Sequence, residues 1–307
     1  MTTAEPPADE PMDAFRDDRV YLGADHARNE RRTWIVATIC LATLAAQVTG
    51  GLMFNSMALV ANGLHMGAHL AALLVAAGAY AVARTYATDP RFSFGTGKVG
   101  YLAGFANAAV LGITALLVTI ESVERLLAPA EVEYDGALVL AAAALAVNLV
   151  CVWLLKPAQS HAHDRDGDLN LSAAHLHLAG DAVISGLAII GLAAGRYLGW
   201  SWTDPVAALV GAALLAHFAW RLLSRTGAVL LDVNPSPELT AQIRARLEGE
   251  GERVLDLHLW RLGPGHHAAI VVLTATAPQA PQAYRARLAG LAGLSHVTVE
   301  VRDHLTP

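Results

Sequence analysis

Six apolar stretches, each about twenty residues long or longer, constrain this chain more than any other feature of its sequence. A helix rises about 1.5 Å per residue, so a stretch of this length crosses the roughly 30 Å hydrocarbon core of a bilayer. The composition agrees, because 54% of the residues are hydrophobic and only 16% are charged. We therefore expect an α-helical membrane protein with six transmembrane helices, over residues 34–55, 57–83, 100–127, 136–155, 172–196 and 203–223.

The distribution of Lys and Arg predicts which side of the membrane each loop occupies. Basic residues lie before the first stretch, between the second and third, and between the fourth and fifth, whereas the opposite loops are uncharged or acidic. Because basic loops stay in the cytoplasm, we expect both termini to be cytoplasmic. Residues 1–33 are expected to form a largely disordered cytoplasmic tail, since they begin acidic and Pro-rich and carry no signal peptide. Residues 34–225 then form the transmembrane domain.

Residues 226–307 have a mixed, charged composition that is too interrupted to span a membrane. Ser236 followed by Pro237 predicts a helix start, and "VLDLHLWRL" and "HHAAIVVLTATA" read as strands joined by the turn "GPG". A second helix over 281–292 leads into the alternating strand "HVTVEVRD". We expect a small cytoplasmic α+β domain. The net charge of −6 comes with no basic face, so nucleic acid is not an expected partner.

Two pairs of polar side chains interrupt the apolar stretches at helical spacing. His65 and His69 are four residues apart in "HMGAH", and His177 and Asp181 are four apart in "HLAGD". Residues at i and i+4 share one face of a helix, and both pairs fall near the bilayer centre, where an unpaired carboxylate is costly. Three imidazoles and one carboxylate make a competent tetrahedral site for a divalent transition metal. We therefore expect these four side chains to hold one ion.

Other interpretations of these residues remain. Each polar group can be satisfied separately between packed helices, and a haem site usually takes single His residues from opposite helices. A zinc hydrolase of the HExxH type needs Glu directly after the first His, where this chain has Met66. His175 lies two residues before His177 and about 160° away around the helix, so it cannot share the face of the site.

The motifs around these residues resemble those of the cation diffusion facilitator family. "SMALVANGLHMGAH" is similar to the family's second-span signature, "HLHLAGDAVISG" to its fifth span, and "FSFGTGKVGYLAGFANA" to the loop that enters its third span. The resemblance covers nearly everything after residue 30. It implies a six-span homodimer with a ferredoxin-like C-terminal domain that exports divalent metals in exchange for protons. The bacterial branch associated with cobalt and nickel efflux is the most similar, which implies the inner membrane.

The resemblance also assigns roles to single residues. It places the transport site at His65, His69, His177 and Asp181, with Asn62 as a candidate group beside the ligands. Thr96 stands where some relatives carry a His of a second metal site, so we expect no metal there. Lys98 resembles a lysine that pairs with an acid just below span 6. Asp232 is the candidate partner, and a solvated loop lysine is the alternative.

Two further groups are candidates for metal outside the membrane. The acidic, His-containing loop between spans 4 and 5 suits weak metal capture through His161, His163 and Asp164, although an ordinary linker has the same composition. Family C-terminal domains hold regulatory metal at the dimer seam. The resemblance makes the candidate ligands there His258, His266, His267 and, from the N-terminal tail, His26.

The expected function is efflux of a divalent transition metal by proton-coupled alternating access, and not an enzyme reaction. Imidazole ligands suit Co²⁺, Ni²⁺ and Zn²⁺, among which the sequence does not choose. Free His titrates near pH 6.5, so the same nitrogens bind either metal or protons. The alternative is a non-transporting membrane metal sensor or assembly protein whose metal site is closed and structural.

Overall fold

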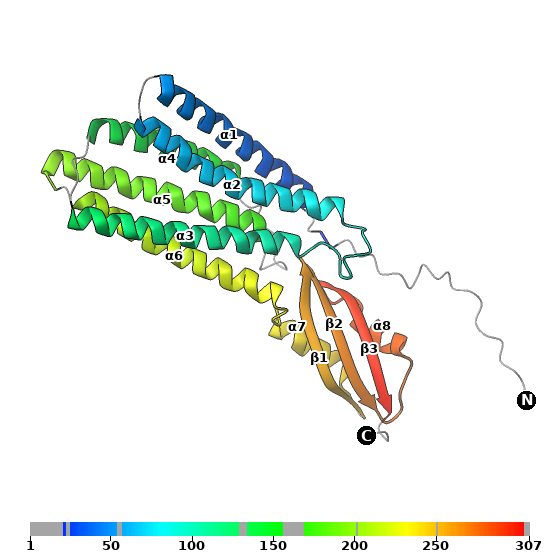
Figure 1. Cartoon of the computed structure of the whole chain (residues 1–307). Coiled ribbons are helices and arrows are strands. Elements are labelled where there is room, and N and C mark those ends of the chain that lie inside the picture. The colour runs from blue at the N-terminus through cyan, green and yellow to red at the C-terminus, as the bar shows by residue number, and fades with distance from the viewer. Residues whose placement is uncertain are drawn as a thin grey trace, which may run out of the picture.

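The computed structural model describes residues 21–22, 25–53, 57–128, 134–155, 169–200, 202–249 and 251–303. Long helices lie side by side and form a bundle with a small sheet domain at one end (Figure 1). The helices of the bundle are α1 His26–Met53, α2 Met57–Thr85, α3 Val99–Leu127, α4 Tyr134–Leu154, α5 Leu169–Leu198 and α6 Thr203–Leu230. Helices suit lipid because every internal backbone N–H and C=O is paired within the segment itself.

The described residues contain four helices that are long and apolar enough to cross a membrane. They are Val99–Leu127, Tyr134–Leu154, Ala174–Leu198 and Thr203–Leu230. Within α2 the stretch Leu70–Thr85 is a shorter apolar helix. The chain is therefore a multi-pass helical membrane protein.

The bundle packs as two groups of helices. In the first, which we call the four-helix group, α1, α2, α4 and α5 share one buried apolar cluster. In the second, the α3–α6 pair, the two helices meet along a row of small buried contacts such as Ala108 with Leu222 and Ala115 with Ala219. The four-helix cluster comprises Val36, Ala37, Cys40, Leu70, Leu73, Ala76, Cys151, Leu155, Ala174 and Leu178. Cys40 and Cys151 are free, buried thiols in contact between α1 and α4.

The C-terminal domain has the element order expected from its sequence. It consists of α7 Pro237–Leu247, β1 Glu252–Gly263, β2 His266–Ala275, α8 Pro281–Leu288 and β3 Leu294–Asp303. The sheet order is β1-β2-β3, with β2 antiparallel to β1 and parallel to β3. Ser236 caps α7 by accepting a hydrogen bond from Leu239 N at 3.1 Å, and Pro237 fills the first turn, where its missing N–H costs nothing.

The helices of this domain cover one face of the sheet only. Buried residues of α7 and α8 pack on inward-facing residues of the strands, which leaves the opposite face without a helix of the described chain. The apolar core comprises Leu239, Ile243, Leu247, Tyr284 and Leu288 from the helices with Leu259, Val271, Leu273 and Val299 from the strands. We call the side without a helix the open face.

Two element boundaries differ from those expected. Helix α1 begins at His26, so residues 26–33 are helical and are not tail, because Glu30 and Asn29 face helical partners in the bundle. Helix α6 continues past residue 225 to Leu230. The polar Thr226 does not end α6, because its hydroxyl bonds to the carbonyl of Leu222 within the same helix at 2.8 Å.

Candidate metal site

The four expected ligands lie on two helices that touch. His65 and His69 belong to α2, His177 and Asp181 belong to α5, and the two helices contact each other directly. Within each pair the spacing is about one helical turn, so each pair lies on one face of its helix. The side chains of these four residues and of Asn62 lie outside the described part of the structure. Their convergence on one ion therefore stays a prediction, which the helix contact permits.

The residues next to the expected ligands are buried in the four-helix cluster. Leu70 directly follows His69, Leu178 directly follows His177, and both leucines pack in that cluster. Apolar packing of this kind leaves no room for water around these two leucines.

Helix α6 approaches α5 closely beside Asp181. A Cβ atom added at Gly180 would lie 2.5 Å from Cδ2 of Leu215, so a larger residue would require this leucine or the helix to shift. Leu215 is 1% exposed and belongs to the α3–α6 pair. The neighbour of the expected carboxylate ligand is therefore one point where the two helix groups meet.

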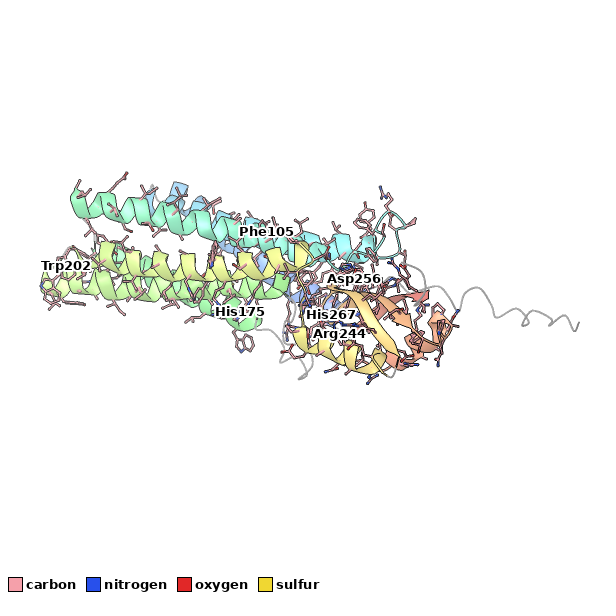
Figure 2. All side chains as sticks on the ribbon, turned by 90° about the horizontal axis from the view of Figure 1, so that it is seen from below. Phe105, His175, Trp202, Arg244, Asp256 and His267 are labelled. Atoms are coloured by element: carbon pink, nitrogen blue, oxygen red, sulfur yellow. The ribbon has the colours of Figure 1, made fainter. Side chains whose placement is uncertain are left out.

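A second close contact joins α5 to α6 at the other end of the bundle. Thr203 Oγ1 donates to the carbonyl oxygen of Gly191 at 2.9 Å, and a Cβ at Gly191 would lie 2.8 Å from Asp204 Cα. Figure 2 shows Trp202, directly before this contact, at the end of the bundle away from the C-terminal domain. His175 projects from the bundle in the same view, consistent with its expected position off the face of His177.

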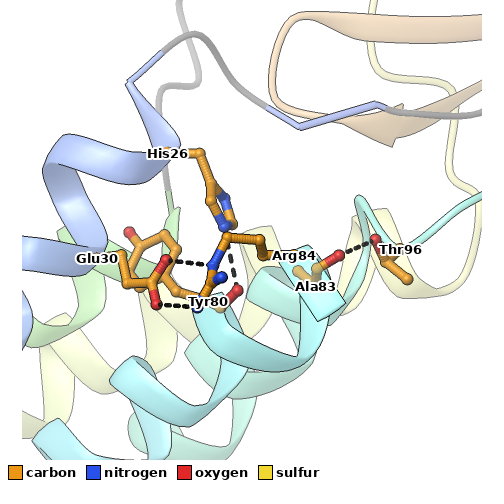
Figure 3. Close-up of polar contacts among 6 residues, drawn as sticks. All are labelled: His26, Glu30, Tyr80, Ala83, Arg84 and Thr96. Carbon is orange, nitrogen blue, oxygen red and sulfur yellow. Dashed lines mark hydrogen bonds and ion pairs between the residues drawn. The ribbon is translucent and has the colours of Figure 1, made fainter. Parts of the chain in front are cut away.

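The loop between α2 and α3, residues 86–98, is folded back on the end of α2. Thr96 Oγ1 donates to the carbonyl oxygen of Ala83 at 2.7 Å, and Thr96 is only 2% exposed (Figure 3). The residue that replaces a family metal ligand is thus an internal anchor of the loop. A hydroxyl is also a poor substitute for imidazole as a transition-metal ligand.

Lys98 and Asp232 form an ion pair, as expected from the resemblance. Lys98 Nζ contacts Asp232 Oδ1. Lys98 directly precedes α3, and Asp232 follows the end of α6 in a left-handed conformation with φ of 56°, which Asp tolerates better than most residues. The pair therefore joins the two helices of the α3–α6 pair at the end nearest the C-terminal domain.

Helices α1 and α2 are joined at the same end of the bundle by polar contacts that the sequence did not reveal. Arg84 Nε and Nη2 each lie 3.2 Å from an oxygen of Glu30, and His26 Nε2 lies 3.1 Å from the carbonyl oxygen of Tyr80 (Figure 3). The His26 ring also stands edge-on to the Tyr80 ring. His26, a candidate metal ligand by sequence, thus binds α2.

The histidines of the C-terminal domain do not gather at one point. His258 Nε2 lies 2.8 Å from Asp256, His266 Nδ1 lies 2.8 Å from Ser295 Oγ, and His267 Nδ1 lies 3.2 Å from Gly293 O. In the β1–β2 register His267 opposes Arg261, so His258 is three residues, about 10 Å, further along.

The described residues contain no group of three or more His, Cys, Asp or Glu side chains arranged for one metal ion. A single-chain metal site made of His258, His266, His267 and His26 is therefore not what the structure forms. The physical reason is the strand register, which a list of histidines does not reveal. The capture-loop residues His161, His163 and Asp164 lie outside the described residues.

Comparison with known proteins identifies the type of bundle. The family model described as the cation efflux transmembrane domain matches residues 33–231. The zinc transporter ZitB of Yersinia pestis is 31% identical over 238 residues, which cover 76% of this chain and 74% of that protein. The metal cation efflux system protein CzcD of Cupriavidus metallidurans is 32% identical over 252 residues, 80% of this chain and 77% of that protein. A cadmium, cobalt and zinc/H⁺-K⁺ antiporter of Bacillus subtilis is 27% identical over 251 residues, covering 80% and 79%.

Proposed function

We propose that this chain, which belongs to the cation efflux or cation diffusion facilitator family, moves divalent metal ions out of the cytoplasm. The protein is a divalent metal efflux transporter of the membrane. One observation carries this conclusion: the family match covers α1 from residue 33 and all of α2 to α6, including both helices that bear the paired ligand-type residues.

We assign the transported ion to His65, His69, His177 and Asp181, with Asn62 beside them. The contact between α2 and α5 supports this assignment, because it allows two i, i+4 pairs to face each other across one helix interface. The nitrogen-rich set favours Co²⁺, Ni²⁺ or Zn²⁺ over ions that prefer oxygen ligands. The names of the relatives, which include zinc, cobalt and cadmium, agree with a transition-metal cargo.

We infer that protons are the counter-ion. Neutral imidazoles bind the metal from the cytoplasm, and protons arriving from the other side compete for the same nitrogens and release it. Alternating access then requires the four-helix group and the α3–α6 pair to move relative to each other. The two groups contact each other at Gly180 and Leu215, next to Asp181, so such a movement would change the packing beside this proposed ligand.

The complete architecture that we propose has six spans, cytoplasmic termini and a ferredoxin-like C-terminal domain. Exposed tryptophans near both ends of the bundle, Trp34 and Trp153 at one end and Trp200 and Trp202 at the other, support a membrane slab that includes α1 and α2. The open face of the sheet, which carries Asp256, His258 and Glu300, is our candidate surface for the partner subunit of a homodimer. Metal between subunits there would use His258 and Asp256, with His266 and His267 nearer the membrane.

Metal flux into proteoliposomes tests the function directly. We expect wild-type protein to transport Co²⁺, Ni²⁺ or Zn²⁺ and His65→Ala to lose at least ten-fold in rate. His217→Ala is the matched control, because this exposed histidine of α6 lies outside the proposed site and should leave the rate unchanged. Flux should vary steeply between about pH 6 and 8, where imidazoles titrate. Tight metal binding without flux in either wild type or variant would favour the closed sensor or assembly site instead.

A further inference from the structure

One row of the open face of the sheet is covered, at the end nearest the bundle. In the strand register Trp260 opposes Ala268, and Ala268 opposes His296, so these three residues form a row across all three strands. The ring of Phe94, from the α2–α3 loop, stands edge-on to Trp260 at 5.5 Å and to His296 at 6.0 Å. The middle residue is a small alanine that is 0% exposed, and the ring of Phe94, itself 46% exposed, contacts the rings on both sides of it.

The segment before α1 covers the same end of the sheet. Tyr21 is only 4% exposed and packs in one cluster with Leu262, Ala268 and Trp260. Its ring centroid lies 5.6 Å from that of His266. A residue from the expected N-terminal tail is therefore a buried part of the C-terminal domain.

Three backbones meet where Tyr21 and Phe94 reach the sheet. A Cβ at Gly97 would lie 2.8 Å from both the Tyr21 carbonyl oxygen and Gly263 Cα, and would overlap the carbonyl oxygen of Leu262. A Cβ at Gly263 would likewise overlap the carbonyl oxygen of Tyr21. Backbone atoms cannot swing aside as side chains do, so both positions require glycine.

The same two segments are anchored on the membrane side to α2. Thr96 bonds the loop to Ala83, and α1, which starts five residues after Tyr21, is tied to α2 through Glu30 and Arg84. Contacts made by the described residues of both segments thus link the sheet with the end of α2. Helix α2 is the helix that carries His65 and His69.

We propose that Tyr21, Phe94 and Gly97 form an intramolecular clamp that docks the C-terminal domain onto the cytoplasmic end of α2 and transmits its position to that helix. The clamp is distinct from the Lys98–Asp232 pair, which joins α3 to α6. Its effect on transport rests on the proposed function, but its existence does not. The clamp can therefore be tested by a measurement that needs no transport.

Hydrogen exchange on the full-length protein in detergent tests the docking. Phe94→Ala should raise amide exchange at least ten-fold in peptides covering 21–22 and 266–270, while peptides of α7 stay unchanged. Phe92→Ala is the matched control, because Phe92 lies in the same loop but packs against Tyr86, with ring centroids 6.2 Å apart. Unchanged exchange in Phe94→Ala, or equal loosening of α7, would overturn the clamp, the latter by showing only a loss of domain stability.

Gly97→Ala tests the transmission without removing any side chain. We expect the same local rise in exchange, together with faster exchange at the end of α2 and at least a three-fold lower metal flux. Gly78→Ala, in α2 itself, is the control, since no atom of the described residues lies within 4 Å of a Cβ built there. If exchange rises at the sheet but flux and α2 are unaffected, coupling is refuted. If no variant or wild type transports, the exchange data still decide whether the clamp exists.

Discussion

Replacing Gly180 by alanine should force α5 and α6 apart beside Asp181. The new Cβ would lie 2.5 Å from Leu215 Cδ2. Carbon atoms pack best at about 3.5–4.0 Å, so one of the two groups must move by about 1–1.5 Å. Leu215 cannot easily rotate away, because it is 1% exposed and held by Leu111 and Ala219 of the α3–α6 pair.

The loss of stability expected for Gly180→Ala can be judged from other buried substitutions. Overpacking of this kind typically costs about 1–3 kcal/mol in free energy of unfolding. Leu215→Ala alone should cost about 2–5 kcal/mol, because it leaves a cavity. In the double variant the alanine methyl occupies part of that cavity, so the combined cost should fall below the sum of the single costs by about 1–3 kcal/mol.

Unfolding by SDS titration in mixed micelles measures the stabilities, and metal flux measures the effect on the site. Gly180→Ala should reduce flux more than its stability loss explains, since the displaced backbone precedes Asp181. Gly186→Ala is the control on the same helix, where no described atom lies within 4 Å of an added Cβ. It should be neutral or stabilising by up to about 1 kcal/mol, as alanine is the better helix former. Additive costs for residues 180 and 215, or equal behaviour at 180 and 186, would refute the reasoning.

Three further predictions concern other parts of the chain. Arg287 donates a hydrogen bond to Glu252 and lowers the pKa of the Glu252 carboxyl below its ordinary value of 4.5. The pair therefore stabilises the C-terminal domain fully above pH 4.5, and this stabilisation is lost as the pH falls through the lowered pKa. The melting-temperature difference between wild type and Glu252→Gln should therefore shrink below about pH 4.5, and a constant difference would contradict it. Cys40 and Cys151 are fully buried, so a membrane-permeant maleimide should label neither thiol in the folded protein and both in SDS, as mass spectrometry would show. Thr96→Val should cost about 1–3 kcal/mol in SDS unfolding by leaving a buried carbonyl unpaired, whereas Thr96→Ser should stay close to wild type.

The parts of the fold that follow from periodicity could be predicted from the sequence. The order of long helices and the order of elements after Pro237 depend on apolar length, alternation and capping, all of which are local. The helix ends were less predictable: α1 starts at His26 because the ion pair of Glu30 with Arg84 and the contact of His26 with Tyr80 extend its packing. These partners are about fifty residues apart in sequence.

The candidate site divides in the same way. The i, i+4 pairs on α2 and α5 can be recognised from residue spacing alone. The pairing of Lys98 with Asp232 was predicted from a family motif. The contacts of Phe94 and Tyr21 could not be predicted, although Phe94 stands inside a quoted family motif, because an aromatic residue in a loop or tail becomes informative only when the surface it covers is known. The histidines of the C-terminal domain show the converse, since their number in the sequence says nothing about the strand register that separates His258 from His267.

The contact of Thr203 with Gly191 fixes where α6 can turn. Because no side chain separates the two backbones there, we expect α6 to pivot at this contact when it tilts against α5. Leu230 lies 27 residues beyond Thr203, about 40 Å along the helix, so a tilt of about 10° swings its far end by about 7 Å. Over that length a small rotation at the Thr203 end becomes a large displacement at the end nearest the C-terminal domain, and the ion pair of Asp232 with Lys98 would carry α3 along with it.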